Sequence, residues 1–196
     1  MEINRDIYLN RLIMRKQNGF IKVITGFRRC GKFYLLNKIF YNYLLSEGVD
    51  KNHIIRFAFD SADDLLLIDE DILDISEQNR KVDPRKFMKY LAGKIVDDEM
   101  YYLLLDEVQL LGNFEAVLNG YMRKDNLDIY VTGSNSKFLS SDILTEFEGR
   151  GDEIHVRRLV HQTQDAIHRE RIDRFDQVEA LRQDDLEDVA VADVGL

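Results

Sequence analysis

Residues 21–33 read Ile21-Lys22-Val23-Ile24-Thr25-Gly26-Phe27-Arg28-Arg29-Cys30-Gly31-Lys32-Phe33. The first five residues are mostly apolar and β-branched, which predicts a short buried strand that ends at Gly26. Apolar residues then recur at three- and four-residue spacing, which predicts a helix over residues 33–45. The pattern therefore indicates a strand, a glycine loop and a helix in immediate succession.

The loop between this strand and helix matches the phosphate-binding pattern GxxxxGK. Glycines let successive backbone N–H groups point at phosphate oxygens, the start of the helix adds partial positive charge, and the lysine reaches the β- and γ-phosphates. A plain glycine turn with a solvated lysine is the structural alternative. The residues expected to contact ATP are Gly26, Phe27, Arg28, Arg29, Cys30, Gly31, Lys32 and Phe33.

Three residues of this loop leave a choice open. Phe33 stands where serine or threonine normally coordinates Mg²⁺, and its side chain has no donor atom for a metal. We therefore expect either nucleotide binding with a weakened metal site or the loss of hydrolysis, and a Phe33 packed inward fits both. Arg28 and Arg29 either add positive potential to the site or form ion pairs with the acidic segment after the second strand.

A second motif lies at Tyr101-Tyr102-Leu103-Leu104-Leu105, an apolar run followed by Asp106 and Glu107. This is the form of a Walker B strand, in which the aspartate orients Mg²⁺ and the adjacent glutamate acts as general base on the attacking water. An apolar strand that ends in acids is also a common structural feature. Its combination with the glycine loop favours the functional interpretation, with Asp106 as the metal residue and Glu107 as a catalytic residue.

Two further candidates come from the last part of the motif-bearing region. Asn135 follows the predicted strand 127–131 and is expected to sense the γ-phosphate, with Ser134 as the next candidate and a plain polar turn as the alternative. Arg150 lies between two glycines and is expected to act as an arginine finger toward a neighbouring subunit, although a plain loop arginine fits the same pattern.

The remaining pattern predicts the fold class. Further strands are expected over residues 53–59, 101–105, 127–131 and 153–156, with helices from residue 84 and over residues 113–122, and with surface loop and irregular helix over residues 61–74. Apolar strands that alternate with helices predict an α/β protein, a P-loop NTPase with a parallel sheet of about five strands covered on both faces. We expect an ATPase domain over residues 1–156, followed by a lysine-free tail over residues 157–196 that is weakly helical or disordered.

Composition narrows the classes of function. The 196 residues carry a formal net charge of −9, so non-specific wrapping of nucleic acid cannot rest on net charge. The apolar runs are far shorter than the roughly 20 residues of a membrane span. A single cysteine excludes an intramolecular disulfide. We expect a soluble cytoplasmic protein with no membrane partner.

The quoted motifs, with Ile3-Asn4-Arg5-Asp6-Ile7-Tyr8-Leu9 and Tyr130-Val131-Thr132-Gly133-Ser134-Asn135-Ser136, resemble those of prokaryotic AAA-type ATPases with an AAA_14 domain. The resemblance implies an AAA+ core that uses ATP and Mg²⁺, a sensor strand between the two motif strands, and assembly into a homo-oligomer. Members of the family generally continue into a C-terminal domain with a nuclease-like fold, so we expect this sequence to be truncated before it. Phe33 departs from the family's GKS.

Three hypotheses for the function follow. The first is an ATP-binding domain of an AAA-type ATPase that couples ATP binding or hydrolysis to a remodelling task or to an unknown protein or DNA partner. The second is a nucleotide-binding module without turnover, because Phe33 replaces the residue that coordinates magnesium. The third is a degenerate truncated product that folds poorly.

Overall fold

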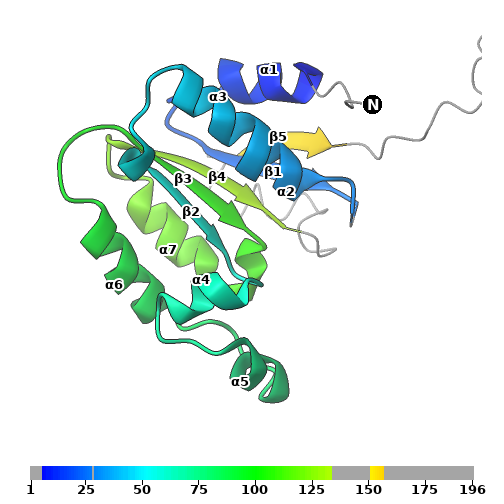
Figure 1. Cartoon of the computed structure of the whole chain (residues 1–196), viewed down its shortest axis with the longest axis vertical. Coiled ribbons are helices and arrows are strands. Elements are labelled where there is room, and N and C mark those ends of the chain that lie inside the picture. Colours follow the sequence, from blue (N-terminus) through cyan, green and yellow to red (C-terminus); the bar gives the residue numbers. More distant parts are fainter. Residues whose placement is uncertain (1–5, 28, 134–150, 157–196) are drawn as a thin grey trace, which may run out of the picture. The chain divides into compact units, whose positions relative to one another are not determined.

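The computed structural model describes residues 6–27, 29–133 and 151–156 (Figure 1). The strands are β1 (Ile21–Gly26), β2 (Ile54–Ala58), β3 (Tyr101–Asp106), β4 (Leu127–Thr132) and β5 (Gly151–Val156). The helices are α1 (Asp6–Met14), α2 (Lys32–Tyr34), α3 (Tyr41–Ser46), α4 (Ala62–Leu66), α5 (Ile72–Glu77), α6 (Pro84–Lys94) and α7 (Phe114–Tyr121). A π-helical segment (Leu35–Phe40) joins α2 to α3, and 3₁₀ turns lie at Lys51–His53 and Val108–Leu110.

The five strands form one parallel sheet in the order β2-β3-β4-β1-β5. This confirms the predicted α/β fold, and it places β4 between β1 and β3, as the family resemblance implies. Because all strands run the same way, their carboxyl ends lie at one edge of the sheet, where ligands bind in proteins of this type. The glycine loop and the Asp106–Glu107 pair both follow strands at this edge.

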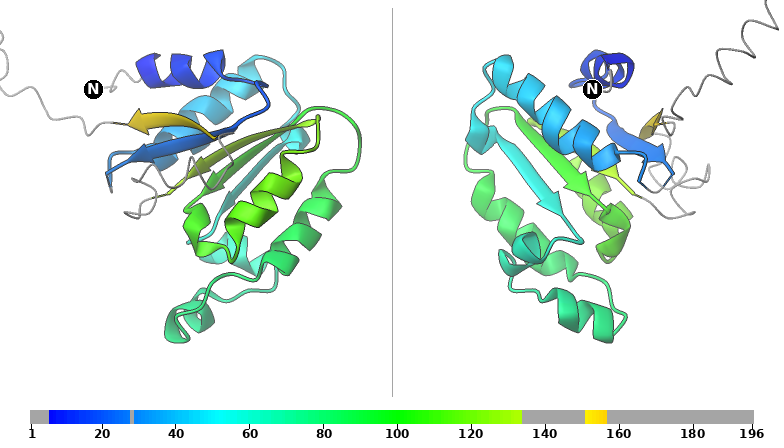
Figure 2. Two further views of the ribbon diagram at one scale, coloured as in Figure 1. Left: turned by 180° about the vertical axis from the view of Figure 1, so that it is seen from behind. Right: turned by 45° about the vertical axis from the view of Figure 1, so that its right-hand side comes forward.

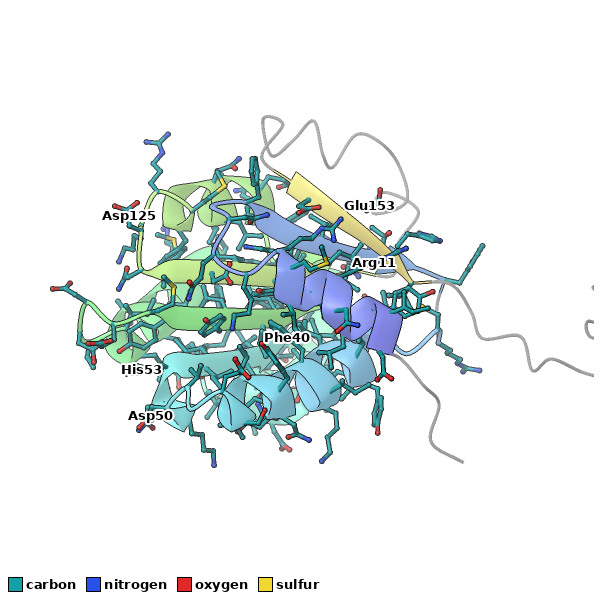
Figure 3. The ribbon with its side chains drawn as sticks, turned by 90° about the horizontal axis from the view of Figure 1, so that it is seen from above. Arg11, Phe40, Asp50, His53, Asp125 and Glu153 are labelled. Carbon is teal, nitrogen blue, oxygen red and sulfur yellow. The ribbon has the colours of Figure 1, made fainter. Side chains whose placement is uncertain are left out.

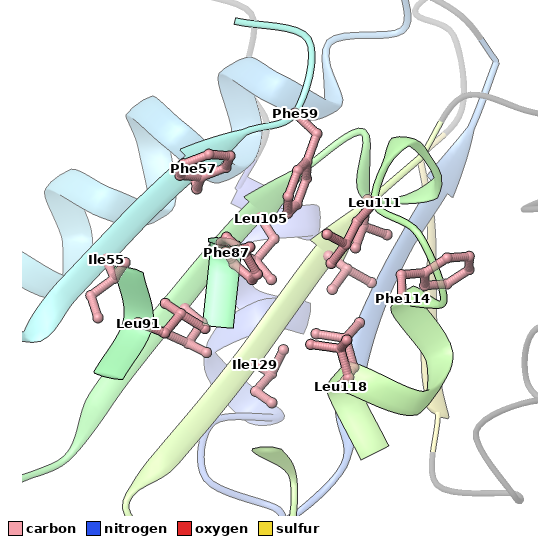
Figure 4. Close-up of a cluster of buried hydrophobic side chains, with 14 of the residues drawn as sticks. Ile55, Phe57, Phe59, Phe87, Leu91, Leu105, Leu111, Phe114, Leu118 and Ile129 are labelled. Carbon is pink, nitrogen blue, oxygen red and sulfur yellow. The ribbon is translucent and has the colours of Figure 1, made fainter. Parts of the chain in front are cut away.

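One face of the sheet packs against α4, α6 and α7 (Figures 2 and 4). Alternate residues of β3, namely Tyr101, Leu103 and Leu105, point to this face because successive side chains of a strand alternate. Three phenylalanines strengthen the packing, with ring centroids 4.9–5.1 Å apart along the contacts Phe57–Phe59, Phe57–Phe87 and Phe59–Phe87.

The opposite face packs against α1 and against the continuous helix of residues 32–46, which we call the loop helix. Phe40 of this helix, labelled in Figure 3, contacts Tyr130 of β4 with ring centroids 4.6 Å apart. Both faces are therefore covered by helices, as predicted. The packing of the loop helix on this face fixes the position of its first turn beside the glycine loop.

The elements differ from the predictions in three places. Helix α1 was not predicted as an element, although Leu12 on its inner face is fully buried. The loop helix was predicted as an ordinary helix, whereas residues Leu35–Phe40 are π-helical. The acidic stretch holds two short helices, α4 and α5, whose first N–H groups are capped by the side chains of Ser61 and Asp71.

Helix α6 begins as predicted from its sequence. The Asp83 carboxylate accepts a hydrogen bond from the Arg85 N–H at 2.9 Å, and Pro84 takes the first helical position. Proline suits this position because the missing N–H has no acceptor inside a helix. Every helix among the described residues is too short or too polar to span a bilayer.

Candidate nucleotide-binding site

The glycine loop begins where β1 ends against β5. Gly26 has a φ of +144°, and a Cβ atom there would lie 2.3 Å from the carbonyl oxygen of Val156 and 2.9 Å from Sγ of Cys30. Only glycine allows this close approach. Gly31, at the start of the loop helix, has a φ of +86°, a left-handed backbone conformation that glycine adopts readily because it has no Cβ atom. The path of the backbone through the loop therefore requires glycine at the first position of the motif and favours it at the second.

Lys32 lies inside the loop and is only 5% exposed. Its Nζ donates hydrogen bonds to the carbonyl oxygens of Gly26, at 3.0 Å, and Phe27, at 3.2 Å. The first N–H groups of a helix lack acceptors within the helix, so they add donors beside this ammonium group. Together they make a compact positive centre that suits a phosphate group.

The other side chains of the loop do not gather around this centre. Phe27 and Arg29 are exposed, and Arg29 forms no ion pair with a residue that the structure describes, so the alternative of an ion pair with the acidic segment is not realised for Arg29. Cys30 is buried against the loop helix. Among the side chains of the loop described here, Lys32 is therefore the one placed at the centre.

The side chain of Phe33 does not pack inward, in contrast to the expectation from the sequence. It is 56% exposed, so it does not pack into the core as an inward-facing helix residue would. No hydroxyl from β1 replaces it, because the Thr25 Oγ1 donates to the carboxylate of Glu153 and lies 3.1 Å from Nδ1 of His155. Glu153 is labelled on β5 in Figure 3. The position after the lysine thus carries an exposed aromatic ring.

Asp106, the last residue of β3, lies buried at the same edge of the sheet. Its Oδ1 accepts a hydrogen bond from Oγ1 of Thr132, the last residue of β4. The same Thr132 oxygen accepts a hydrogen bond from the N–H of Glu107 at 3.3 Å. Thr132 therefore holds the carboxylate of Asp106 and the backbone of Glu107 in a fixed relation.

Burial dominates the electrostatics of Asp106. It raises the pKa of this carboxyl to about 6, and the negative charges of Glu107 and Asp60 act in the same direction. The hydrogen bond from Thr132 and the positive charge of Lys32 oppose the shift. The pKa of Asp60 is also raised, first by the loss of surrounding water and then by the charge of Glu107. Carboxylates with raised pKa values at one edge favour a cation there.

Glu107 adopts a left-handed backbone conformation, with a φ of +52°. Its carboxylate accepts a hydrogen bond from the side-chain amide of Gln109, two residues further on. The turn places Glu107 just beyond the end of β3 and not within the ladder of the sheet. A general base at this position would be oriented by Gln109.

The donor atoms fit Mg²⁺ only in part. Among the described residues, no group of three or more His, Cys, Asp and Glu side chains is placed to hold a metal alone. Mg²⁺ usually needs just one or two carboxylates together with phosphate oxygens and water, and Asp106 supplies such a carboxylate. The hydroxyl that would complete this set is absent, since Phe33 has only carbon in its side chain.

Sequence reasoning overlooked two residues of this edge, Thr132 and Asp60. Thr132 is a polar residue at the end of an apolar strand, and the register that pairs Leu105 with Val131 places it beside Asp106. Asp60 follows the strand next to β3. The sequence feature that could have indicated both is a polar residue at or just after the end of an apolar strand. Arg28, Ser134, Asn135 and Arg150 lie outside the described residues.

A parallel sheet in this order, with the lysine loop after β1 and an acidic pair at the end of β3, defines a P-loop ATPase domain of the AAA type. Residues 18–162 match the family model AAA_14, described as an AAA domain, and the chain belongs to this family.

Two uncharacterized proteins are similar in sequence. One, from Haemophilus influenzae, is 32% identical over 155 residues, which are 79% of this chain and 35% of that protein. The other, from Methanocaldococcus jannaschii, is 32% identical over 152 residues, which are 76% of this chain and 27% of that protein. The chain thus spans about a third of the length of the first relative and about a quarter of the second.

Two solved structures are similar in shape. A structure of Drosophila ORC bound to DNA has a TM-score of 0.48 and 16% identity, and the match covers 81% of this chain and 93% of that one. A crystal structure of a DNA replication initiation factor has a TM-score of 0.48 and 18% identity, over 86% of this chain and 49% of that one.

Proposed function

We propose that the chain binds ATP at the loop of residues 26–33 and that Phe33 impairs its hydrolysis. The observation that carries the proposal is the buried ammonium of Lys32, held by the carbonyls of Gly26 and Phe27 on the edge of the sheet that also carries Asp106. Such a positive centre beside a buried acid suits a triphosphate with its magnesium ion. Membership of an AAA family supports the same conclusion.

Each residue of the edge has a distinct part in this proposal. Lys32 contacts the β- and γ-phosphates, and the loop backbone supplies N–H donors to the remaining phosphate oxygens. Asp106 holds Mg²⁺, directly or through water, and Thr132 keeps its carboxylate in place. Glu107 accepts the proton of the attacking water. Asn135 as sensor and Arg150 as finger stay predictions.

Phe33 is the reason to expect slow turnover. A bound Mg²⁺ would neutralise charge that develops on the transferred phosphoryl group. Without a hydroxyl at position 33, the ion is held from the protein side by Asp106, whose raised pKa marks a buried carboxyl that is costly to ionise. We therefore expect ATP binding to depend weakly on Mg²⁺ and hydrolysis to be slow.

The test is to replace Phe33 by serine and measure ATP binding and phosphate release with and without Mg²⁺. Phe33→Ser should bind ATP more tightly in the presence of Mg²⁺ and release phosphate at least about tenfold faster than the wild type. Tyr34→Ser is the matched control, because Tyr34 is a neighbouring aromatic residue that is 52% exposed. It should behave like the wild type. Equal turnover of the wild type and Phe33→Ser would reject the impairment.

The task that ATP drives lies beyond this site. Coupling to a protein or DNA partner, assembly into a homo-oligomer and the division between an ATPase domain and a tail near residue 156 stay predictions. A module that binds ATP and never hydrolyses it is the second candidate, and the aromatic ring of Phe33 favours it. The same experiment separates the two, since only the first shows slow wild-type phosphate release.

A further inference from the structure

A hollow of about 550 Å³ runs along the outer side of β2. This strand is the last in the sheet, so its far side pairs with no strand among the described residues (Figure 2, right). The loop helix forms one wall of the hollow with Phe33 and Asn37, and α6 forms the other with Tyr90, Gly93 and Lys94. The hollow is therefore a groove whose floor is the edge of a strand.

Backbone hydrogen bonds are made at both ends of this edge. The N–H of Ala58 donates to a carboxylate oxygen of Asp64 at 2.8 Å, and the Ala58 carbonyl accepts from Ser61 at 3.1 Å. At the start of β2, the N–H of Ile54 donates to Lys51. Outward-facing residues alternate along a parallel strand, so the N–H and C=O of Arg56 face the groove between these two ends.

The groove is basic although the whole chain carries a formal charge of −9. Lys51, Arg56 and Lys94 line it, and none of them forms an ion pair with a described residue. The guanidinium of Arg56 lies 4.1 Å from the ring centroid of Tyr41, which holds it at the wall. Asp64 also lines the groove, and its carboxylate accepts a hydrogen bond from the N–H of Ala58.

The wall of the groove also carries an unsatisfied polar group. Asn37 is only 8% exposed, and its amide nitrogen has no hydrogen-bond partner among the described residues. A buried amide without a hydrogen-bond partner destabilises the fold. This nitrogen is closed off from the groove, which therefore offers a ligand backbone groups and basic side chains along one edge.

We propose that an extended acidic segment of another protein binds here as an additional strand beside β2. Main-chain hydrogen bonds to Arg56 would provide the affinity, and the three basic side chains would select acidic residues. A second copy of this chain fits less well, because pairing two β2 edges would bring basic residues against basic residues. The groove shares Phe33 with the nucleotide loop, but its strand edge and its three basic side chains belong to other residues, so the proposal does not rest on ATP hydrolysis.

The probe is a fluorescein-labelled heptapeptide of alternating valine and aspartate, titrated against the full chain and followed by fluorescence anisotropy. Two related peptides serve as comparisons, one with lysine in place of aspartate and one N-methylated along the edge that would pair with β2. We expect the acidic peptide to bind and each comparison peptide to bind at least about tenfold more weakly. Absence of binding, or equal binding of the N-methylated peptide, would overturn the proposal.

Gly93 offers a way to close the groove. A Cβ built at Gly93 meets no atom within 4 Å, so Gly93→Leu should fill the groove without straining α6 and weaken peptide binding at least about tenfold. Gly120→Leu is the matched control, since Gly120 lies in α7 with equally open space. It should leave binding unchanged. Equal effects of both changes would contradict the assignment.

A second variant keeps the test valid if Gly93→Leu folds poorly. Arg56→Glu reverses the charge at the middle of the groove, where the side chain is exposed. We expect it to lose affinity for the acidic peptide and to gain affinity for the lysine peptide. A loss of affinity for both peptides alike would show that charge does not select the ligand and would overturn the proposal.

Discussion

At the scale of single residues, ionised Asp106 lowers the stability of the folded chain because its carboxyl is buried. Burial raises its pKa from the ordinary 3.8 to about 6 in the folded chain, so folding favours the protonated form. The folded state binds more protons than the unfolded state between these values, and stability therefore falls as pH rises from about 4 to about 6. Above about pH 6 the full cost is present.

Replacing Asp106 by asparagine should remove this cost. We expect Asp106→Asn to raise the free energy of unfolding by about 1–3 kcal/mol at about pH 7.5, because a neutral amide can still accept the hydrogen bond from Thr132. Urea denaturation at two pH values measures it. At about pH 4 the gain should shrink, since wild-type Asp106 is then protonated too. A variant less stable than the wild type at about pH 7.5 would show that the carboxylate is not the source of strain.

The residues of the site differ in how far sequence could predict them. Lys32 and Asp106 sit in short patterns whose spacing follows from phosphate and metal chemistry, and the structure places both at one edge of the sheet. Thr132 and Asp60 were missed because they become neighbours of Asp106 only through the pairing of strands far apart in the chain. Long-range pairing is the information that a local pattern lacks.

At the scale of elements, β1 and β4 are joined by an ion pair between Lys22 and Asp128 that no motif indicated. The side chains are 0% and 2% exposed, and Asp128 also accepts hydrogen bonds from Tyr130 and from the N–H of Gln17. Burial lowers the pKa of Lys22, while Asp128 opposes the shift. Removing one partner would leave the other charge buried without compensation.

We therefore expect Asp128→Asn to lower the free energy of unfolding by about 3 kcal/mol or more. Asp152→Asn is the matched control, because Asp152 pairs with Arg15 at 2.7 Å in a partly exposed bridge. That change should cost less than about 1 kcal/mol. Urea denaturation of both variants gives the comparison, and equal losses would show that the buried pair has no special weight.

Helix α1 and the loop helix show why helices are harder to predict from this sequence than strands. Each end of the strands was predicted to within two residues because apolar runs between turns are distinctive. Helix α1 was missed because its apolar side is narrow, with Leu12 as its fully buried residue. The π-helical turns of the loop helix depend on packing against the sheet, which the spacing of apolar residues does not encode.

At the scale of the whole molecule, the fold class followed from the alternation of elements, whereas the order of the strands was predicted only in part, through the family resemblance. Alternating strands and helices predict a parallel sheet, but several orders satisfy the same alternation. The resemblance placed one strand, β4, between β1 and β3, and the sheet of the described residues has this arrangement, whereas the places of β2 and β5 were not predicted. What the ATPase domain does within longer relatives is a separate matter, since the chain spans only 35% and 27% of their lengths.

The most direct measurement is calorimetric titration of ATP into the wild type, Lys32→Ala and Lys38→Ala. Lys38 is an exposed lysine of the same loop helix and serves as the control. We expect the wild type and Lys38→Ala to bind one ATP alike, and Lys32→Ala to bind at least about tenfold more weakly because it loses the charged contact to phosphate. No binding by the wild type, or undiminished binding by Lys32→Ala, would contradict a nucleotide site at this loop.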